Sequence, residues 1–367
     1  MKTHKICFFA GTHGNWGGAS RVLFTNLRLL DRNRFTPIVL LSAHGPAETL
    51  MDELGIQYKV WGPLTEPGRH LEYIRAVLRT CIWLRQQHID LVHMNRANHW
   101  RPAELLATRI CKRPVVTHFH TVNLDHAPAT RWSTAIAAVS SYVAQHSDTL
   151  GVPASVIYNT VDLGRFSKGN NLRSRFDIEA DQIVVSFIGQ IRKIKGIEDF
   201  VSMARQVAGE GVRFLIAGEC RDKSSIGDAY TKEELQNLIS SDPRIRYCGY
   251  IEQVEDIFHS SDIVVVPSRW EEPFGLVCIE AAAAGLPVVA TRTGGLPEVV
   301  ADGITGLLVE AGDIQAMTRQ VQRLIDDAHF RAALGKAARD RVEHEFAEKP
   351  IHALEDLYES LLRRSSD

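Results

Sequence analysis

The stretch Pro267–Gly295 reads PSRWEEPFGLVCIEAAAAGLPVVATRTGG and decides the fold class of this chain. It begins where the apolar run Ile263–Pro267 ends, passes through a polar loop and enters a helical pattern at about Gly275. Gly285 is a typical helix stop signal, and the apolar run Pro287–Thr291 indicates the next buried strand. A strand, a helix and a second strand in this order predict a parallel sheet covered by helices.

The same alternation extends over most of the chain and predicts an α/β fold of two Rossmann-like, doubly wound domains facing a cleft. The polar segment Asn159–Arg173 lacks apolar periodicity and is interpreted as the linker. We expect one domain over residues 1–165, a second over 166–347, and a closing helix over 348–367 that packs back on the first domain. The predicted strands are Lys5–Ala10, Phe35–Leu41, Gln57–Val60, Asp90–His93, Pro114–His118, Ala135–Val139, Ile183–Ile188, Val212–Ala217, Ile245–Cys248, Ile263–Pro267, Pro287–Thr291 and Gly306–Val309.

The bulk composition is that of a globular protein. With 367 residues, 45% hydrophobic and 23% charged, the chain suits two domains of ordinary size. Its six cysteines are scattered and form no CxxC pair, which predicts reduced thiols in a cytoplasmic protein. We find no signal peptide pattern and no apolar run long enough to span a bilayer.

Charge is distributed unevenly along the chain. Met1–Val161 contains 17 Lys and Arg against 10 Asp and Glu, whereas the remaining residues contain 25 against 34. A basic half favours an anionic partner such as a membrane surface, a phospholipid-linked acceptor or nucleic acid. Ordinary drift in charge between two domains explains the asymmetry equally well.

The stretch Pro267–Gly295 contains two glutamates that are candidate ligand-binding residues. Glu272 lies in the loop before the predicted helix, and Glu280 lies near its second turn. The amides of Gly275, Leu276 and Val277 would point, with the positive end of the helix dipole, at a bound phosphate. One carboxylate could accept hydrogen bonds from sugar hydroxyls and the other from a ribose diol. Taken alone, either glutamate could equally be an ordinary acidic residue.

Lys195 is the candidate cation. It lies in FIGQIRKIKGIEDF, Phe187–Phe200, where a buried strand ends and a helix begins near Gly196. An ammonium group there could stabilise a leaving diphosphate, on which negative charge builds as a glycosidic bond breaks. By itself, a lysine at a helix start is more often a solvated side chain.

Two further segments of the first half end predicted strands. In FFAGTHGNWGGAS, Phe8–Ser20, a glycine-rich turn precedes a helix, and Trp16 could stack on an acceptor ring or simply pack. In PVVTHFHTVN, Pro114–Asn123, His118 and His120 lie two residues apart on one strand face. No carboxylate cluster or third ligand accompanies these histidines, so no metal site is expected.

Together these segments resemble the donor-site motifs of family-four (group 1) retaining glycosyltransferases. Glu272 and Glu280 have the family's seven-residue separation, and the Gly-Pro-Val-Val pattern at Gly285–Val289 and paired glycines at Gly294–Gly295 follow. The resemblance implies a GT-B fold, an acceptor on the first domain, a nucleotide-sugar donor in the second, and transfer with retained anomeric configuration. It also implies that no metal or other cofactor is needed, with a nucleotide diphosphate sugar as co-substrate.

The resemblance also assigns residues. His120 matches the histidine near the reacting sugar, Gly17 and Gly18 match the family's paired glycines, and Gln190 replaces a common arginine, which shifts a phosphate contact to Arg192 or leaves it neutral. The implied catalytic residues are His120, Lys195 and Glu272. The implied donor-binding residues are Gly17, Gly18, Gln190, Arg192, Lys195, Glu272, Phe274, Gly275, Leu276, Val277 and Glu280.

Other functions remain open at this point. A sugar-nucleotide epimerase would use the same fold, and a catalytically silent subunit would bind nucleotide sugar without turnover. The implied partners are a nucleotide sugar and a carbohydrate or lipid-linked acceptor, as in polysaccharide, lipopolysaccharide or glycolipid synthesis, with no nucleic acid. The helix His70–Gln87, with Arg69, Arg75, Arg79 and Arg85 among apolar residues, could rest on the inner face of an anionic membrane, or it could be an ordinary packed helix.

Overall fold

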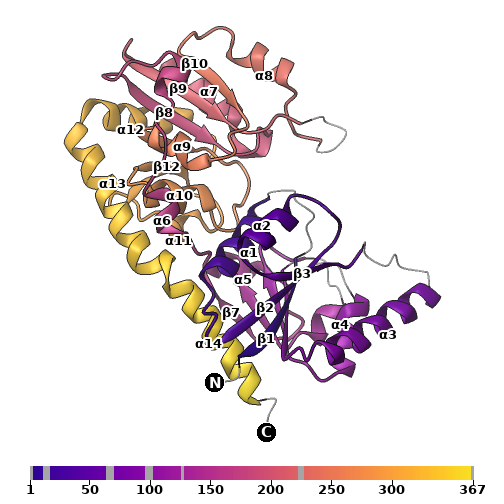
Figure 1. The fold of residues 1–367 in the computed structure, drawn as a ribbon. Helices are drawn as coiled ribbons and strands as arrows, with labels where there is room; N and C mark the ends of the chain where they lie inside the picture. Colours follow the sequence, from indigo (N-terminus) through magenta and orange to yellow (C-terminus); the bar gives the residue numbers. More distant parts are fainter. Residues whose placement is uncertain are drawn as a thin grey trace. The chain divides into compact units, whose positions relative to one another are not determined.

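A computed structural model describes residues 3–10, 17–62, 70–95, 102–124, 128–221 and 227–364. The contacts between residues divide the chain into two units, which are Met1–Thr160 with Glu348–Asp367, and Val161–Ala347 (Figure 1). Trp16 and Arg69, which the sequence motifs suggest as functional candidates, lie outside the described residues. None of the described helices is long and apolar enough to cross a membrane.

The first unit is built on a seven-stranded parallel sheet with the order β3-β2-β1-β4-β5-β6-β7. The sequence predicts every strand but β7, whose three exposed residues carry no apolar pattern and pair only with β6. The strands are β1 His4–Phe9, β2 Phe35–Leu41, β3 Gln57–Val60, β4 Leu91–Met94, β5 Val115–Phe119, β6 Ala135–Ala138 and β7 Ala154–Val156.

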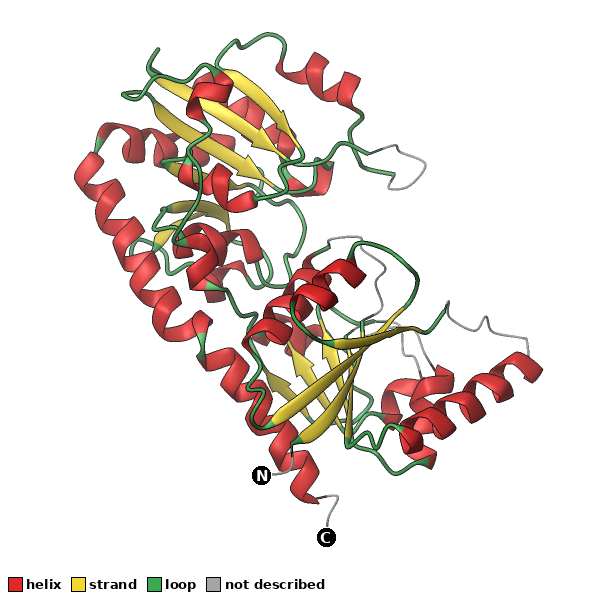
Figure 2. Ribbon diagram, in the orientation of Figure 1, coloured by secondary structure: helices red, strands yellow, loops and turns green. Residues whose placement is uncertain are grey.

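Helices cover both faces of this sheet (Figure 2). One face packs against α1, α2 and α14, and the opposite face against α3 and α4. Because β1, β2, β4 and β5 are buried on both faces, they are almost continuously apolar rather than alternating. The helices are α1 Gly18–Leu29, α2 Ala47–Glu53, α3 His70–Gln86, α4 Pro102–Ile110, α5 Ser141–His146 and α14 Lys349–Arg364.

The C-terminal helix α14 packs on the first unit although it follows the second in sequence (Figure 1). Its Tyr358 is fully buried, with its ring 5.8 Å from that of Phe35. Its Glu355 accepts hydrogen bonds from the Asp31 amide at 2.8 Å and from Arg34 Nη1 at 2.9 Å. A buried carboxylate with these two donors stabilises the docked position of the helix.

The second unit contains a six-stranded parallel sheet with the order β10-β9-β8-β11-β12-β13. One face packs against α7, α8 and α12, and α10 lies against β11 and β12. Its strands are β8 Ile183–Ile188, β9 Val212–Ala217, β10 Ile245–Gly249, β11 Ile263–Val266, β12 Val288–Thr291 and β13 Gly306–Val309. Its helices are α6 Leu163–Phe166, α7 Ile197–Gln206, α8 Lys232–Ile239, α9 Val254–His259, α10 Leu276–Ala283, α11 Leu296–Val299, α12 Ile314–Asp326 and α13 Ala328–Val342.

The segment predicted as a linker is mostly packed on the second unit. Its Phe166 is buried with its ring 5.6 Å from that of Phe258, and Arg165 forms a 2.8 Å ion pair with Glu255. Polar side chains of this segment bond to α9 instead of facing water. The segment therefore lacks apolar periodicity although it is packed against the second unit.

Both sheets have a doubly wound strand order. Each therefore has a switch point, where the chain stops adding strands on one side of its first strand and continues on the other side. That point lies between β1 and β4 in the first unit and between β8 and β11 in the second. Sheets of this type bind ligands beyond the carboxyl ends of the strands at such a switch point. A ligand is therefore expected beside the residues that follow these four strands and their neighbour β5.

Candidate active site

In the second unit, the chain that leaves β8 approaches the end of β11 very closely. Gly196 has a φ of +74°, and a Cβ atom added to it would lie 1.8 Å from the carbonyl oxygen of Pro267. Only glycine fits a left-handed position with no room for a side chain. This contact brings Lys195, in the 3-10 turn Lys193–Lys195, beside the loop that follows β11.

Lys195 and Glu272 form an ion pair at the switch point. Lys195 Nζ lies 2.5 Å from Glu272 Oε1, and the same oxygen accepts a 2.6 Å hydrogen bond from Ser268 Oγ. The Lys195 ammonium also lies 4.8 Å from the ring centroid of Trp270. Glu272 is 7% exposed, so its negative charge is held largely away from water and is compensated by these two donors.

The paired glycines predicted from the sequence hold the backbone of Glu272. Gly295 donates its amide hydrogen to the Glu272 carbonyl oxygen at 2.7 Å. A Cβ atom on Gly294 would lie 2.2 Å from that same oxygen, so a side chain there would push the strand-end loop away. Thr291 Oγ1 donates to the Ser268 carbonyl oxygen at 2.7 Å and fixes the start of the loop.

Three residues that hold the Lys195–Glu272 site in place are not predicted from the sequence. Ser268 bonds to Glu272 directly, and Arg269 bonds to the buried Asp199 in the first turn of α7 through Nε at 2.7 Å. The Arg269–Asp199 pair ties the loop after β11 to the helix after Lys195. Serine, arginine and aspartate are common at such positions, so no sequence signal separates these three from solvated residues.

The helix α10 begins where the sequence predicts, with Gly275 as its N-cap. Its first backbone hydrogen bond runs from the Cys278 amide to the Gly275 carbonyl oxygen, so the amides of Gly275, Leu276 and Val277 precede the intrahelical ladder. Glu280 is 5% exposed, which argues against the alternative of a solvated acid. Burial, and then the charges of Glu272 and Glu280, raise the pKa of Cys278, so both carboxylates lie near this thiol.

The remaining predicted donor residues differ in how they are engaged. Arg192 is paired with Asp228 at 2.6 Å, so its charge is already compensated, whereas Gln190 is exposed just past β8. The Phe274 side chain is buried against Phe346, with ring centroids 5.8 Å apart. Phe274 therefore presents its backbone, not its ring, toward any ligand near α10.

In the first unit, His120 lies directly after β5 and Asn95 directly after β4. His120 Nε2 lies 3.0 Å from Asn95 Oδ1, and Asn95 Nδ2 donates to the carbonyl oxygen of Ala19 at 3.1 Å. Asn95 thus connects His120 with the first turn of α1, next to Gly17 and Gly18. The sequence analysis named the histidine and the glycines but missed Asn95, which has no motif around it.

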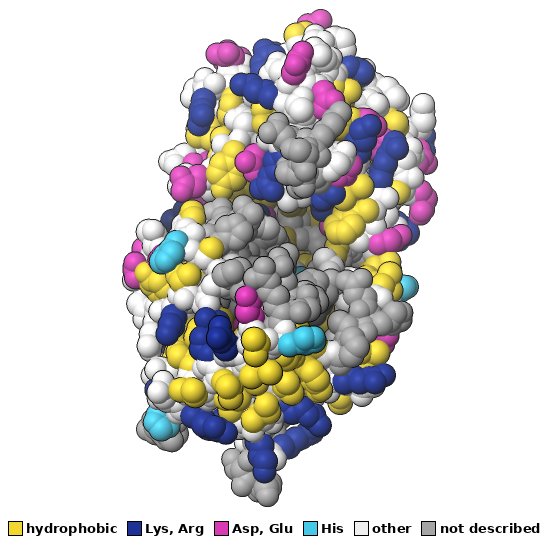
Figure 3. Space-filling model, turned by 90° about the vertical axis from the view of Figure 1, so that its right-hand side faces the viewer, with side chains coloured by type: hydrophobic (Ala, Val, Ile, Leu, Met, Phe, Trp, Pro, Cys, Tyr) yellow, Lys and Arg dark blue, Asp and Glu magenta, His cyan; other side chains and the backbone are white. Residues whose placement is uncertain are grey.

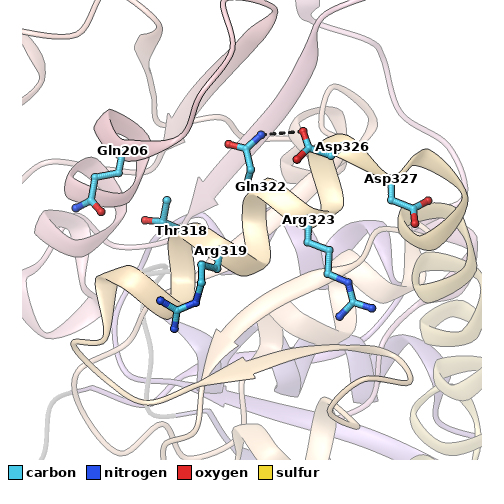
Figure 4. A pocket seen from close by; sticks show the side chains of 7 residues that line it. All are labelled: Gln206, Thr318, Arg319, Gln322, Arg323, Asp326 and Asp327. Atoms are coloured by element: carbon cyan, nitrogen blue, oxygen red, sulfur yellow. Dashed lines mark hydrogen bonds between the residues drawn. The ribbon is translucent and has the colours of Figure 1, made fainter.

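A hollow on the described surface lies elsewhere in the second unit. It is a shallow groove of about 530 Å³ between α7 and α12 (Figure 4). None of the predicted site residues lines it, and no group of three or more His, Cys, Asp or Glu among the described residues is placed to hold a metal ion. Its lining residues are Gln206, Thr318, Arg319, Gln322, Arg323, Asp326 and Asp327.

Lys195 and the α10 amides together make the second switch point suited to an anion. A half-buried ammonium and three backbone donors at a helix start would attract phosphate oxygens, and Glu272 and Glu280 add acceptors for hydroxyl groups. This combination of donors and acceptors matches a phosphorylated sugar better than either a plain anion or a neutral sugar.

Two protein families match this chain in sequence. Residues 182–327 match the family described as glycosyl transferases group 1, and residues 16–165 match the family described as Glycosyltransferase Family 4. D-inositol 3-phosphate glycosyltransferase from Mycolicibacterium smegmatis is 34% identical over 216 residues, which is 58% of this chain and 48% of that protein. The chain thus spans about half the length of this relative.

Solved structures share the fold over nearly the whole chain. A glycosyltransferase from Rickettsia africae has a TM-score of 0.84 at 18% identity and covers 99% of both chains. Anabaena Alr3699/HepE, solved with UDP and glucose, has a TM-score of 0.81 at 22% identity, covering 97% of this chain and 100% of that one. With the family matches in both halves and this GT-B fold, the chain belongs to the group 1, family 4 glycosyltransferases.

Proposed function

We propose that this chain is a retaining, metal-independent, hexosyltransferase-type enzyme that moves a sugar from a nucleotide diphosphate sugar to an acceptor hydroxyl. The observation that carries this proposal is the ion pair between Lys195 and Glu272 beside the start of α10. The pair combines a cation for the diphosphate with a carboxylate for sugar hydroxyls at the switch point of the sheet.

In the proposed reaction, the bond between the anomeric carbon and the diphosphate breaks through an oxocarbenium-like state. The acceptor hydroxyl attacks from the face that the diphosphate leaves, and its proton passes to the departing diphosphate oxygen. Lys195 and the amides of Gly275, Leu276 and Val277 stabilise the charge that builds on the leaving diphosphate. Glu272, released from Lys195 by the incoming phosphate, orients the sugar.

The other predicted residues complete the donor site in this proposal. Glu280 accepts hydrogen bonds from the ribose, and Gln190 contacts a phosphate. Arg192 takes part only through rearrangement of its pair with Asp228. From the first unit, the amides of Gly17 and Gly18 bind the donor phosphate, and His120 lies beside the reacting sugar.

The donor can be tested by binding. The similar Anabaena protein was solved with UDP and glucose, so UDP-sugars stand first in a panel with GDP- and ADP-sugars. A ligand of the folded state raises the melting temperature, and we expect one base to do so in the wild type but not in Lys195→Ala. A panel without any shift would contradict the proposal.

Turnover separates the remaining alternatives. An epimerase converts the nucleotide sugar with no acceptor present, and a silent subunit binds it without consuming it. We expect release of nucleoside diphosphate that depends on an added acceptor, which is a carbohydrate or a lipid-linked saccharide in polysaccharide, lipopolysaccharide or glycolipid synthesis. Conversion without acceptor would support the epimerase.

We also propose that α3 holds the enzyme at the inner face of an anionic membrane. Four apolar side chains spaced along one side of the helix are more than half exposed: Leu71 at 73%, Ile74 at 53%, Leu78 at 56% and Ile82 at 54%. Arg75 and Arg85 are exposed on the same helix, while Arg79 lies over the Trp61 ring at 4.3 Å. Figure 3 views the side that carries α3 and α4 in Figure 1, where hydrophobic side chains gather among Lys and Arg.

The membrane proposal has a matched test. Ile304 of the second unit is 65% exposed, so Ile304→Glu adds the same charge outside α3 and outside the first unit. At low salt we expect wild type and Ile304→Glu to bind phosphatidylglycerol vesicles in a sedimentation assay, and Ile74→Glu to bind about tenfold less. Equal binding of both variants would exclude α3 as the contact.

A further inference from the structure

Asn95 occupies a position from which it can set the chemistry of His120. It is 2% exposed, and its amide hydrogen is donated to the Phe9 carbonyl oxygen at 3.1 Å, which holds it at the end of β4 beside β1. Its side-chain amide lies between a backbone carbonyl of α1, at 3.1 Å, and His120 Nε2, at 3.0 Å. Both contacts have ordinary hydrogen-bond lengths.

These two contacts leave one arrangement of hydrogens. The carbonyl oxygen of Ala19 can only accept, so the NH2 group of Asn95 must face it. The Asn95 oxygen then faces His120, and because this oxygen can only accept, His120 Nε2 must carry a hydrogen. In a neutral imidazole with Nε2–H, the other nitrogen, Nδ1, is a hydrogen-bond acceptor.

A second ring, that of His118, packs against one face of the His120 ring. His118 stacks on His120 with centroids 4.2 Å apart and planes 27° apart. Neither ring nitrogen of His118 has a hydrogen-bond partner among the described residues, so its contact with His120 is made by the ring face. Burial lowers the pKa of His118 to about 4, which keeps this support uncharged near neutral pH.

A further edge-to-face ring contact connects His118 to His93, which contacts the C-terminal helix α14. The ring of His93, on β4, lies 5.3 Å from that of His118, and its Nδ1 lies 2.7 Å from the hydroxyl oxygen of Tyr358 on α14. His120 therefore rests on a continuous row of buried side chains that begins near the end of the sequence. Rows of this kind restrict ring rotation because each member is close-packed.

We propose that Asn95 is a positioning residue that holds His120 in the Nε2–H tautomer. The consequence for sugar transfer rests on the proposed function, in which His120 lies beside the reacting sugar. His118 fixes the ring plane, and Asn95 fixes which nitrogen carries the hydrogen. An aliphatic residue of similar size at position 95 would keep the packing but lose the tautomer control.

The tautomer can be measured without any substrate. In protein labelled with 15N-histidine, long-range 15N–1H correlation spectra distinguish a protonated from an unprotonated ring nitrogen, and His120→Gln identifies the His120 signals. We expect Nε2–H alone in the wild type and a mixture of tautomers in Asn95→Leu. A wild-type spectrum with Nδ1–H, or with a mixture, overturns the proposal whatever the enzyme does.

Kinetics test the consequence for transfer. We expect Asn95→Leu to lower kcat about tenfold while the donor-induced rise in melting temperature stays as in the wild type. Asn26→Leu is the matched control, because Asn26 is also a buried asparagine of the first unit, on α1, and should leave both quantities near wild type. Equal kcat in the two variants overturns the role of Asn95. A chain that transfers no sugar at all contradicts the proposed function, and the spectra still decide the tautomer.

Discussion

The two units place their candidate residues at the same point of the sheet, but these residues form an ion pair in the second unit and a contact through an uncharged amide in the first. Each has a doubly wound sheet, and in each the candidate residues follow the strands on either side of the switch point. In the second unit these residues form an ion pair, Lys195 with Glu272 at 2.5 Å. In the first unit, Asn95 and His120 meet through an uncharged amide, backed by His118, which burial keeps neutral.

In both units the fold sets where these groups meet, and the type of side chain sets which chemistry is possible there. A charged pair can exchange its partner for a diphosphate as charge moves in the reaction. A hydrogen bond to an uncharged amide gains little from charge but fixes direction, which suits the orientation of hydroxyl groups.

Removal of the Lys195 charge should have the largest effect. We expect Lys195→Ala to lower kcat by about 10² to 10³, the loss typical of one electrostatic group at a developing charge. Lys193→Ala is the matched control, because Lys193 is exposed in the same 3-10 turn. Steady-state rates of nucleoside diphosphate release measure both. If Lys193→Ala is as damaging as Lys195→Ala, then general positive charge, not the ion pair, explains the site.

The glycines at the two switch points should respond differently to alanine. Gly196→Ala would clash with the Pro267 carbonyl oxygen and force a left-handed residue, so we expect a loss of roughly 3 kcal/mol in the free energy of unfolding. Gly17 has a φ of −72° and no described atom within 4 Å of an added Cβ, so Gly17→Ala should cost less than about 0.5 kcal/mol. Urea denaturation measures both variants. A stable Gly17→Ala that no longer binds donor would support its phosphate contact, whereas equal losses of stability would contradict the contrast.

The neutral support of the first unit should make the fold sensitive to acid. His118 titrates at about pH 4 when folded and near 6.5 when unfolded, so below pH 6.5 the unfolded chain binds the extra proton. Stability contributed by His118 is therefore complete above pH 6.5 and is lost as the pH falls toward 4, by about 2 kcal/mol at pH 5. Urea denaturation at pH 7 and pH 5 measures the loss. His118→Phe keeps a ring without the titration and should lose less, and an equal loss would exclude His118 as the cause.

Chelation should have the smallest effect. In the proposed mechanism, Lys195 and the α10 amides supply the positive charge, so we expect EDTA to change kcat by less than about twofold. The same assay with added Mg²⁺ or Mn²⁺ serves as the control. Activity that disappears with EDTA and returns with one metal would contradict metal independence.

Much of the fold follows from the sequence because buried parallel strands leave an apolar pattern. All twelve predicted strands agree with the structure within one residue at both ends. The structure also contains a strand that the sequence does not predict, β7, which is exposed and is held by backbone hydrogen bonds to β6. The residue-by-residue roles in the candidate site stay predictions, since motifs name residues and not their partners.

The local sequence was sufficient to predict the alternation of strands and helices, and it singled out Glu272, Glu280 and Lys195 as candidate donor-site residues. These features depend on residues close together in the chain, where periodicity and spacing carry the information. Only the tertiary structure decided that Ser268 and Lys195 share one oxygen of Glu272, that Arg269 bonds to Asp199, and that a row from Tyr358 supports His120. Those contacts join segments up to 265 residues apart. Lys195 and the loop after β11 meet because parallel strands bring their carboxyl ends to one edge of the sheet, whereas Tyr358 reaches His93 because α14 packs on the first sheet.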